Sequence, residues 1–173
     1  MPQTLDQHAF NIERWHEVSS DPLLSSLDHR VETDCYGHLV MTPPPGLDHG
    51  GFQSEIVFLM RTLLPKGKVF TECPVSTNEG VKGLDVAWIT SGRLQNARRH
   101  NLLVSAPEVC VEILSPSNSR AEIQNKRALY FQSGAEEVWI CDLNGKISFF
   151  VGDSSGKQSQ STICPDFPAQ IEG

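Results

Sequence analysis

Two carboxylates stand inside apolar segments that have the character of buried strands. Asp85 lies in GLDVAWIT, residues 83–90, and Glu112 lies in EVCVEIL, residues 108–114. A lone charged carboxylate in such a strand costs on the order of several kcal/mol, so each needs a base, a metal ion or a hydrogen-bonding shell. Side chains alternate across a strand, so each carboxylate shares its face with uncharged neighbours. If the two strands pair, the carboxylates meet, which is unfavourable unless a cation lies between them.

A helix predicted over residues 118–134, NSRAEIQNKRALYFQSG, adds a possible cation. Glu122, Lys126 and Tyr130 are spaced i, i+4 and i+8 and form one stripe of that helix. A strand–turn–helix connection can fold this stripe back toward Glu112, where Lys126 could polarise water or hold a phosphate oxygen. Hydrolysis of a phosphodiester needs metal-binding carboxylates, an activated water and a positive charge. Oxygen ligands of this kind suit Mg²⁺ or Mn²⁺ rather than zinc.

Structural roles explain the same residues. Glu112 and Lys126 suit a buried ion pair, and Asp85 suits a strand-entry residue that accepts backbone amides. Glu122 and Lys126 also match an ordinary exposed helix pair, which contributes little, and Tyr130 matches a core residue. From the residues alone, the catalytic and the structural interpretations both stay open.

The remaining pattern predicts one α/β (or α+β) domain over residues 1–173, with a central mixed sheet flanked by helices. A short helix over 9–18 and a hairpin over 29–41 precede a helix over 47–64, which Pro65 ends. Strands are expected over 68–75, 83–90, 108–114, 136–143 and 146–152. The last two are joined by Asn144-Gly145, a strong hairpin signal. Residues 153–156 read as a loop, and the tail as an edge strand or irregular chain.

Composition narrows the class of protein. A chain of 173 residues with 39% hydrophobic and 20% charged residues can build a core of its own. Its formal net charge of -7 argues against a broad basic surface for nucleic acid, but not against a metal-dependent enzyme acting on phosphates. The N-terminus lacks the apolar core of a signal peptide, and no apolar run is long enough to cross a membrane. Five scattered cysteines without a C-x-x-C pair argue against zinc and disulfides and predict a cytoplasmic protein.

The order GLDVAWI … APEVCVEILSPSNSRAEIQNKRALYFQSGAEEVWICDL resembles the Uma-type family of bacterial restriction-endonuclease-like proteins, within the PD-(D/E)XK nuclease superfamily. The resemblance covers residues 30–152, and its most specific part is Glu-x-Leu-Ser-Pro-Ser. Three departures are visible. Leu84 replaces a proline, Glu122 replaces an aspartate, and no proline follows Asp142.

The resemblance implies a restriction-endonuclease-like core with a divalent metal on an acidic pair. Asp85 and Glu112 would be catalytic metal ligands, and the peptide carbonyl of Ile113 would be a further ligand. The superfamily places a lysine two residues after the glutamate, where this chain has Leu114; in the Uma-type pattern the lysine has migrated to the next helix, as Lys126. Glu122 and Tyr130 would orient the lysine. Glu55 and Glu72 are candidates for a further acidic contact, and His49, at the start of a helix, is a candidate capping residue or base.

We therefore expect a DNA endonuclease that depends on Mg²⁺ or Mn²⁺ and acts as a homodimer, because two strands call for two sites. The competing expectation is a non-catalytic nucleic-acid-binding or assembly module on the same fold, which the acidic charge favours. No membrane partner is expected.

Overall fold

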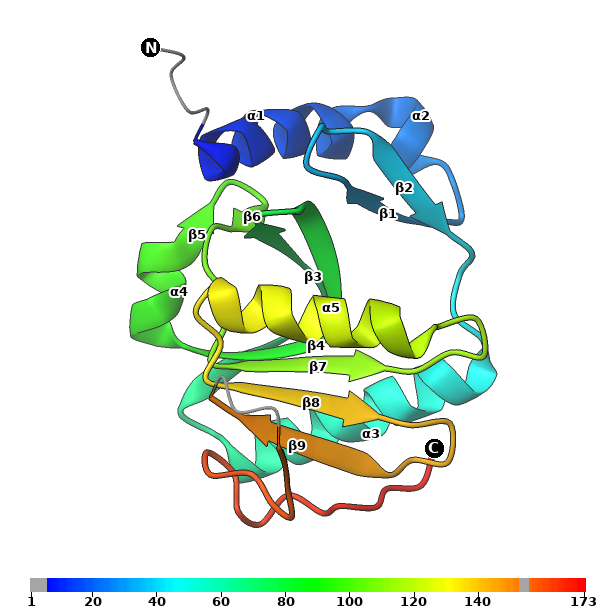
Figure 1. Ribbon diagram of the computed structural model, residues 1–173, viewed down its shortest axis with the longest axis vertical. Coiled ribbons are helices and arrows are strands. Elements are labelled where there is room, and N and C mark those ends of the chain that lie inside the picture. The colour runs from blue at the N-terminus through cyan, green and yellow to red at the C-terminus, as the bar shows by residue number, and fades with distance from the viewer. Residues whose placement is uncertain (1–5, 153–155) are drawn as a thin grey trace.

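The computed structural model describes residues 6–152 and 156–173 and has a mixed sheet with helices on both faces (Figure 1). The elements that precede the sheet are α1 (Gln7–Ser20), α2 (Pro22–Ser25), β1 (Arg30–Thr33), β2 (Leu39–Thr42) and α3 (Leu47–Leu63). The sheet and its helices comprise β3 (Gly67–Thr77), β4 (Gly80–Thr90), α4 (Ser91–Ala97), β5 (Arg98–Arg99), β6 (Leu102–Leu103), β7 (Val109–Ile113), α5 (Arg120–Gln132), β8 (Glu137–Cys141), β9 (Ile147–Val151) and β10 (Lys157–Gln158). The mixed α/β fold class predicted from the sequence is confirmed.

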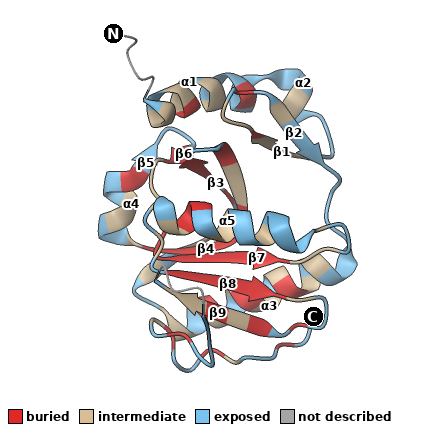
Figure 2. Cartoon of the chain, viewed as in Figure 1, coloured by how far each residue is buried: buried red, intermediate tan, exposed pale blue. Residues whose placement is uncertain are grey.

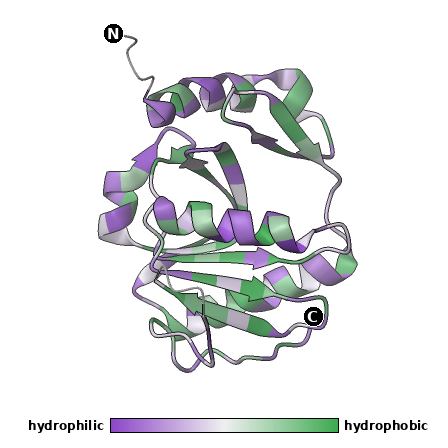
Figure 3. Cartoon of the chain, in the orientation of Figure 1, coloured by the Kyte–Doolittle hydropathy of each residue, from purple (hydrophilic) through white to green (hydrophobic). Residues whose placement is uncertain are grey.

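The sheet has eight strands in the order β10-β9-β8-β7-β4-β3-β6-β5. β7 and β8 run parallel, with α5 as their crossover, and β4 pairs antiparallel with β7. The parallel pair explains the near-continuous apolar runs of β7 and β8, because both faces of these strands are covered. Figure 3 shows these central strands as largely hydrophobic, whereas α1 and α5 alternate between hydrophilic and hydrophobic residues.

Two apolar layers separate the helices from the sheet, and Figure 2 shows the central strands buried along most of their length. On one face, Phe52, Ile56 and Met60 of α3 pack with Trp88 and Trp139 of the strands. On the other face, α5 and α4 cover a layer that includes Ala87, Ile89, Cys110, Tyr130 and Ile140. Glu112 shares its strand face with Cys110 and points toward α5, whereas Asp85 lies where β4 leaves the register and is reached from both α3 and β1.

The first hairpin does not join the main sheet. β1 and β2 form a separate two-stranded sheet, with Arg30 opposite Thr42. β1 lies against the start of β4, where the amide of Val81 donates to Thr33 Oγ1 at 2.9 Å. Gly80 permits this approach because a Cβ at that residue would lie 2.3 Å from the Thr33 carbonyl oxygen. The hairpin therefore brings its own side chains to the α5 side of the sheet's central strands.

The predicted strands and long helices are present with small shifts of their ends, and the short elements between β4 and β7 went unpredicted. α4, β5 and β6 occupy 91–103, where the sequence lacks a clear periodicity. The hairpin signal at Asn144-Gly145 is confirmed, with Gly145 at φ 78°. The loop predicted at 153–156 falls largely outside the described residues, and the tail is mostly irregular after the short β10. None of the helices in the described part of the chain combines the length and apolar character that crossing a membrane requires.

Candidate active site

Asp85 and Glu112 lie at the same end of the pairing of β4 with β7. Val86 pairs with Val111 and Ala87 with Cys110, and Asp85 and Glu112 are the residues just beyond the last pair of this antiparallel register. The Ile113 amide donates to Asp85 Oδ2 at 2.6 Å, which ties the Asp85 side chain to the end of β7. Both carboxylates are buried, with exposed fractions of 1% and 4%. Local strand alternation and register thus bring together the two acids that the sequence singled out.

Glu112 is held by two side chains of α5. Lys126 Nζ lies 3.3 Å from Glu112 Oε2, and the Tyr130 hydroxyl donates to Glu112 Oε1 at 2.6 Å. Lys126 also contacts Glu32 Oε1 of β1 at 3.2 Å. The i, i+4 stripe of α5 therefore does fold back onto β7, as the turn after the strand predicted. Ser119 caps that helix by accepting from the Glu122 amide, which fixes where it begins.

The electrostatics of Glu112 and Lys126 reflect shared burial. Burial raises the pKa of Glu112 to about 7, the charge of Lys126 opposes this rise, and the nearby Asp85 charge adds to it. Burial disfavours the charged form of Lys126, yet the charges of Glu112 and Glu32 hold its pKa above the usual range. Lys126 consequently stays protonated and serves as the fixed cation on this side of the pair.

Asp85 also has donors from two further elements, β1 and α3. Arg30 of β1 forms an ion pair with Asp85 Oδ1, and His49 Nε2 of α3 lies 3.3 Å from the same oxygen. Burial works against the ionised form of Asp85, but the hydrogen bond from His49 and the charge of Arg30 hold its pKa below the usual range. Asp85 is therefore the ionised member of the pair across the neutral pH range.

Arg30 joins Asp85 to a second carboxylate, Glu72 of β3. Arg30 Nε donates to Glu72 Oε2 at 2.7 Å, and Gln53 Nε2 donates to Glu72 Oε1 at 2.8 Å. Glu72 has φ 49°, in the left-handed region, and its position is the one step missing from the β3–β4 register. Non-glycine residues in this region carry strain that the surrounding structure must hold, and such strain clusters at functional sites.

The donor set matches the chemistry of a hard divalent cation. Four carboxylates and two permanent cations meet here, so two negative charges are in excess when all are ionised and His49 is neutral. His49 Nδ1 is buried and, within the described residues, has no hydrogen-bond partner. The described residues hold no group of three or more His, Cys, Asp or Glu arranged as a metal site. Asp85 and Glu112 are the carboxylates that could hold a cation here, and Arg30 would first have to release Asp85 Oδ1.

The other residues expected around the site fall into two sets. His49 and Glu72 reach the cluster, through Asp85 and Arg30 respectively. Glu122 is exposed and accepts from Asn118 Nδ2 at 3.0 Å, and Tyr130 donates to Glu112. Among the hydrogen bonds and ion pairs of the described residues, neither side chain is joined to the lysine that they were expected to orient. Glu55 is half-buried on α3, and the contacts of the described residues do not join it to the cluster.

Sequence reasoning missed Arg30, Glu32 and Gln53. Arg30 and Glu32 are two residues apart in HRVET and share one face of β1, so alternation marks a charged face on the hairpin. Nothing local shows that this face turns toward Asp85 and Lys126, because that depends on how the hairpin docks on β4.

Comparisons with known proteins identify the family and agree with the fold. A family model named Uma2, described as "Putative restriction endonuclease", matches residues 17–170. A crystal structure described as "a putative nuclease belonging to DUF820", from Anabaena variabilis, has a similar fold. Its TM-score is 0.67, its sequence identity is 16%, and the match covers 82% of this chain and 86% of that one. No curated protein matches the chain significantly. The family expected from the sequence is confirmed, and this chain belongs to the Uma2 family.

Proposed function

We propose that this protein is a metal-dependent endonuclease that hydrolyses phosphodiester bonds of DNA at the Asp85–Glu112 cluster. The observation that carries the proposal is the meeting of two buried carboxylates at the end of the β4–β7 pairing, with Lys126 3.3 Å from one of them. This is the set of groups that phosphodiester hydrolysis requires. Membership of a family described as restriction endonucleases supports the same reaction class.

Each side chain has a distinct role in this proposal. Asp85, Glu112 and the Ile113 carbonyl hold Mg²⁺ or Mn²⁺, which when bound supplies a Lewis acid for the scissile phosphate and the attacking water. Lys126 places a positive charge beside the metal-binding carboxylates, where it positions water or neutralises a phosphate oxygen. Tyr130 fixes one oxygen of Glu112, and Glu32 holds Lys126 from the opposite side. In this proposal Lys126, on α5, takes the role that the superfamily pattern gives to a lysine at the position of Leu114.

A second candidate function is a nucleic-acid-binding module without catalysis. The ion pair between Arg30 and Asp85 favours it, because the guanidinium already balances the charge that a metal would neutralise. In the catalytic proposal, Arg30 yields Asp85 to the metal and retains Glu72. The same proposal includes a homodimer, because two sites can cut the two strands of a duplex. It also includes a cytoplasmic location.

The experiment compares the unaltered chain with Asp85→Asn, Glu112→Gln and Lys126→Met on supercoiled plasmid in Mn²⁺ or Mg²⁺. Glu13→Gln on α1 and Lys66→Met, both at exposed positions, serve as matched controls. Binding of Mn²⁺ is measured separately by calorimetry. We expect nicking and linearisation by the parent and both controls, and loss of at least about a hundredfold in each site variant. Mn²⁺ binding should be lost in Asp85→Asn and Glu112→Gln but persist in Lys126→Met.

Two outcomes would count against the proposal. Cleavage that survives all three substitutions would remove the site assignment. Absence of both cleavage and Mn²⁺ binding, with DNA binding retained, would establish the non-catalytic module instead.

A further inference from the structure

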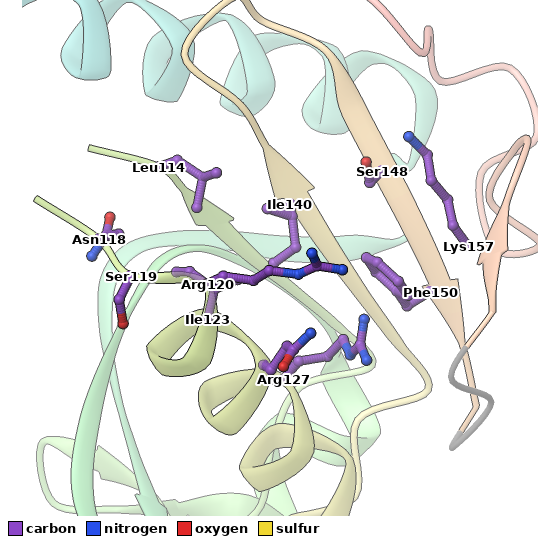
Figure 4. A pocket seen from close by; sticks show the side chains of 11 residues that line it. Leu114, Asn118, Ser119, Arg120, Ile123, Arg127, Ile140, Ser148, Phe150 and Lys157 are labelled. Carbon is purple, nitrogen blue, oxygen red and sulfur yellow. The ribbon is translucent and has the colours of Figure 1, made fainter. Parts of the chain in front are cut away.

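A basic groove lies between α5 and strands β8 to β10 (Figure 4), and the stripe of α5 that lines it differs from the one that contacts Glu112. Its volume is about 480 Å³, and it is bounded by α5, the turn after β7, and strands β8 to β10. Along α5, Arg120, Ile123 and Arg127 are spaced i, i+3 and i+7 and form the stripe that faces the groove. Lys126 and Tyr130, which contact Glu112, lie on a different stripe of the same helix.

The groove has an apolar floor and a cationic rim. The floor comprises Leu114, Ile123, Ile140 and Phe150. The rim carries Arg120, Arg127 and Lys157, and the described residues that line the groove include no carboxylate. On a chain with a formal net charge of -7, three cations without an acidic partner among the lining residues mark a place that attracts anions.

The cations are arranged rather than scattered. The Arg127 guanidinium lies over the Phe150 ring, 4.1 Å from its centre. This cation–π contact holds one rim cation in place against the apolar floor. Figure 4 shows Arg120 extending from the start of α5 toward Phe150, and Lys157 approaching from β10. Ser119, Gln124 and Ser148 add uncharged polar groups to the lining.

The groove is connected to the carboxylate cluster through one short segment. Leu114, Asn118 and Ser119 line it and belong to the turn that directly follows Glu112 and Ile113. The groove therefore reaches the turn that follows β7, the strand that carries Glu112. A repeating anion with an apolar part between charges fits both the rim and the floor, and the sugar–phosphate backbone of a nucleic acid has this pattern.

We infer that this groove binds one strand of the nucleic acid substrate through its phosphates and directs it to the Asp85–Glu112 cluster. This inference rests on the proposed function for its choice of ligand. The strand binds through charge on Arg120, Arg127 and Lys157, without reading base sequence, so the contribution is strongly dependent on salt.

The test measures binding of fluorescent single-stranded and duplex oligonucleotides by anisotropy at several salt concentrations, in EDTA so that cleavage does not interfere. The parent is compared with Arg120→Ala/Arg127→Ala/Lys157→Ala. The matched control is Arg61→Ala/Lys66→Ala, which removes exposed cations at and just after the end of α3, on the opposite face. We expect the triple variant to bind about tenfold or more weakly at low salt, with a salt slope reduced by about two to three. The control should change neither quantity.

Further variants separate binding from folding. Arg120→Lys/Arg127→Lys keeps the charge, so it should restore most of the affinity if phosphate contact is the role of these residues. Thermal unfolding and Mn²⁺ binding of each variant should match the parent. Equal affinity and slope in the triple variant and the parent would overturn the inference, as would equal competition by polyglutamate, which would make the groove a site for acidic peptides.

The failure of this inference differs from the failure of the proposed function. A parent that binds DNA through these residues yet does not cleave leaves the groove assigned and removes the nuclease. A protein that cleaves equally well with and without the three cations leaves the nuclease assigned and removes the groove.

Discussion

Replacing Lys126 by methionine tests the electrostatic account of the cluster without relying on catalysis. Methionine keeps an unbranched apolar stem of similar length and removes the charge. The change leaves Glu112 and Glu32 without the cation that contacts both, at 3.3 and 3.2 Å. The side chains of Lys126, Glu32 and Glu112 are 14%, 12% and 5% exposed, so water screens the loss only weakly.

The magnitude follows from removing one partner of a buried ion pair, which costs about 3–5 kcal/mol. The cost depends on pH through Glu112. Its pKa is raised to about 7 in the folded state from 4.5, so the folded state binds this proton more tightly, and its deprotonation lowers stability as pH rises across that interval. We therefore expect about 3 kcal/mol of destabilisation in Lys126→Met at pH 8, where Glu112 is ionised. At pH 5, where Glu112 carries its proton, the loss should be smaller.

Urea unfolding in EDTA at pH 5 and pH 8 measures both values, and thermal unfolding at pH 8 should show a decrease of about 6–12 °C in Tm. The double variant Lys126→Met/Glu112→Gln should recover part of the loss at pH 8, because it removes the uncompensated carboxylate. A cost below about 1 kcal/mol at pH 8, or an equal cost in the Glu112→Gln background, would refute this reasoning.

Two further substitutions test other parts of the structure. Glu137 is fully buried and accepts from Ser161, Thr162, Trp139 and the Ile163 amide, and although burial alone would raise the pKa of its carboxyl, these donors hold it below the usual range. The ionised Glu137 therefore stabilises the fold above its unfolded pKa, and this stabilisation is lost as pH falls. Glu137→Gln should cost about 1–3 kcal/mol at pH 7 and flatten the loss of stability in acid. Urea unfolding from pH 7 to pH 3 measures both effects, and an unchanged pH profile would contradict this explanation. Gly80 has φ 95° and lies against the Thr33 carbonyl, so Gly80→Ala should cost at least about 2 kcal/mol and weaken Mn²⁺ binding by displacing the β1 hairpin. Gly92→Ala, where a Cβ meets open space, is the control and should be neutral or slightly stabilising in the same unfolding assay, and equal effects of the two would contradict the explanation.

The amino-acid sequence by itself determined the central strands, α5 and the acids they carry. Their signals are local: apolar runs for β7 and β8, a serine cap at Ser119, and a helical spacing that puts Lys126 and Tyr130 on one stripe. Strand alternation also assigned Asp85 and Glu112 to faces before their pairing was known. Because these features repeat over two to four residues, the chain specifies them without reference to distant segments.

Only the tertiary structure decided what surrounds those acids. Arg30 is 55 residues before Asp85, and Glu32 is 94 residues before Lys126, so their contacts exist only because the hairpin docks on β4. The groove likewise forms only where one stripe of α5 meets strands that follow it in the chain. Local periodicity can assign a residue to a face of its own element. Which other element covers that face depends on the packing of the whole sheet, and this packing sets the charge balance of the site.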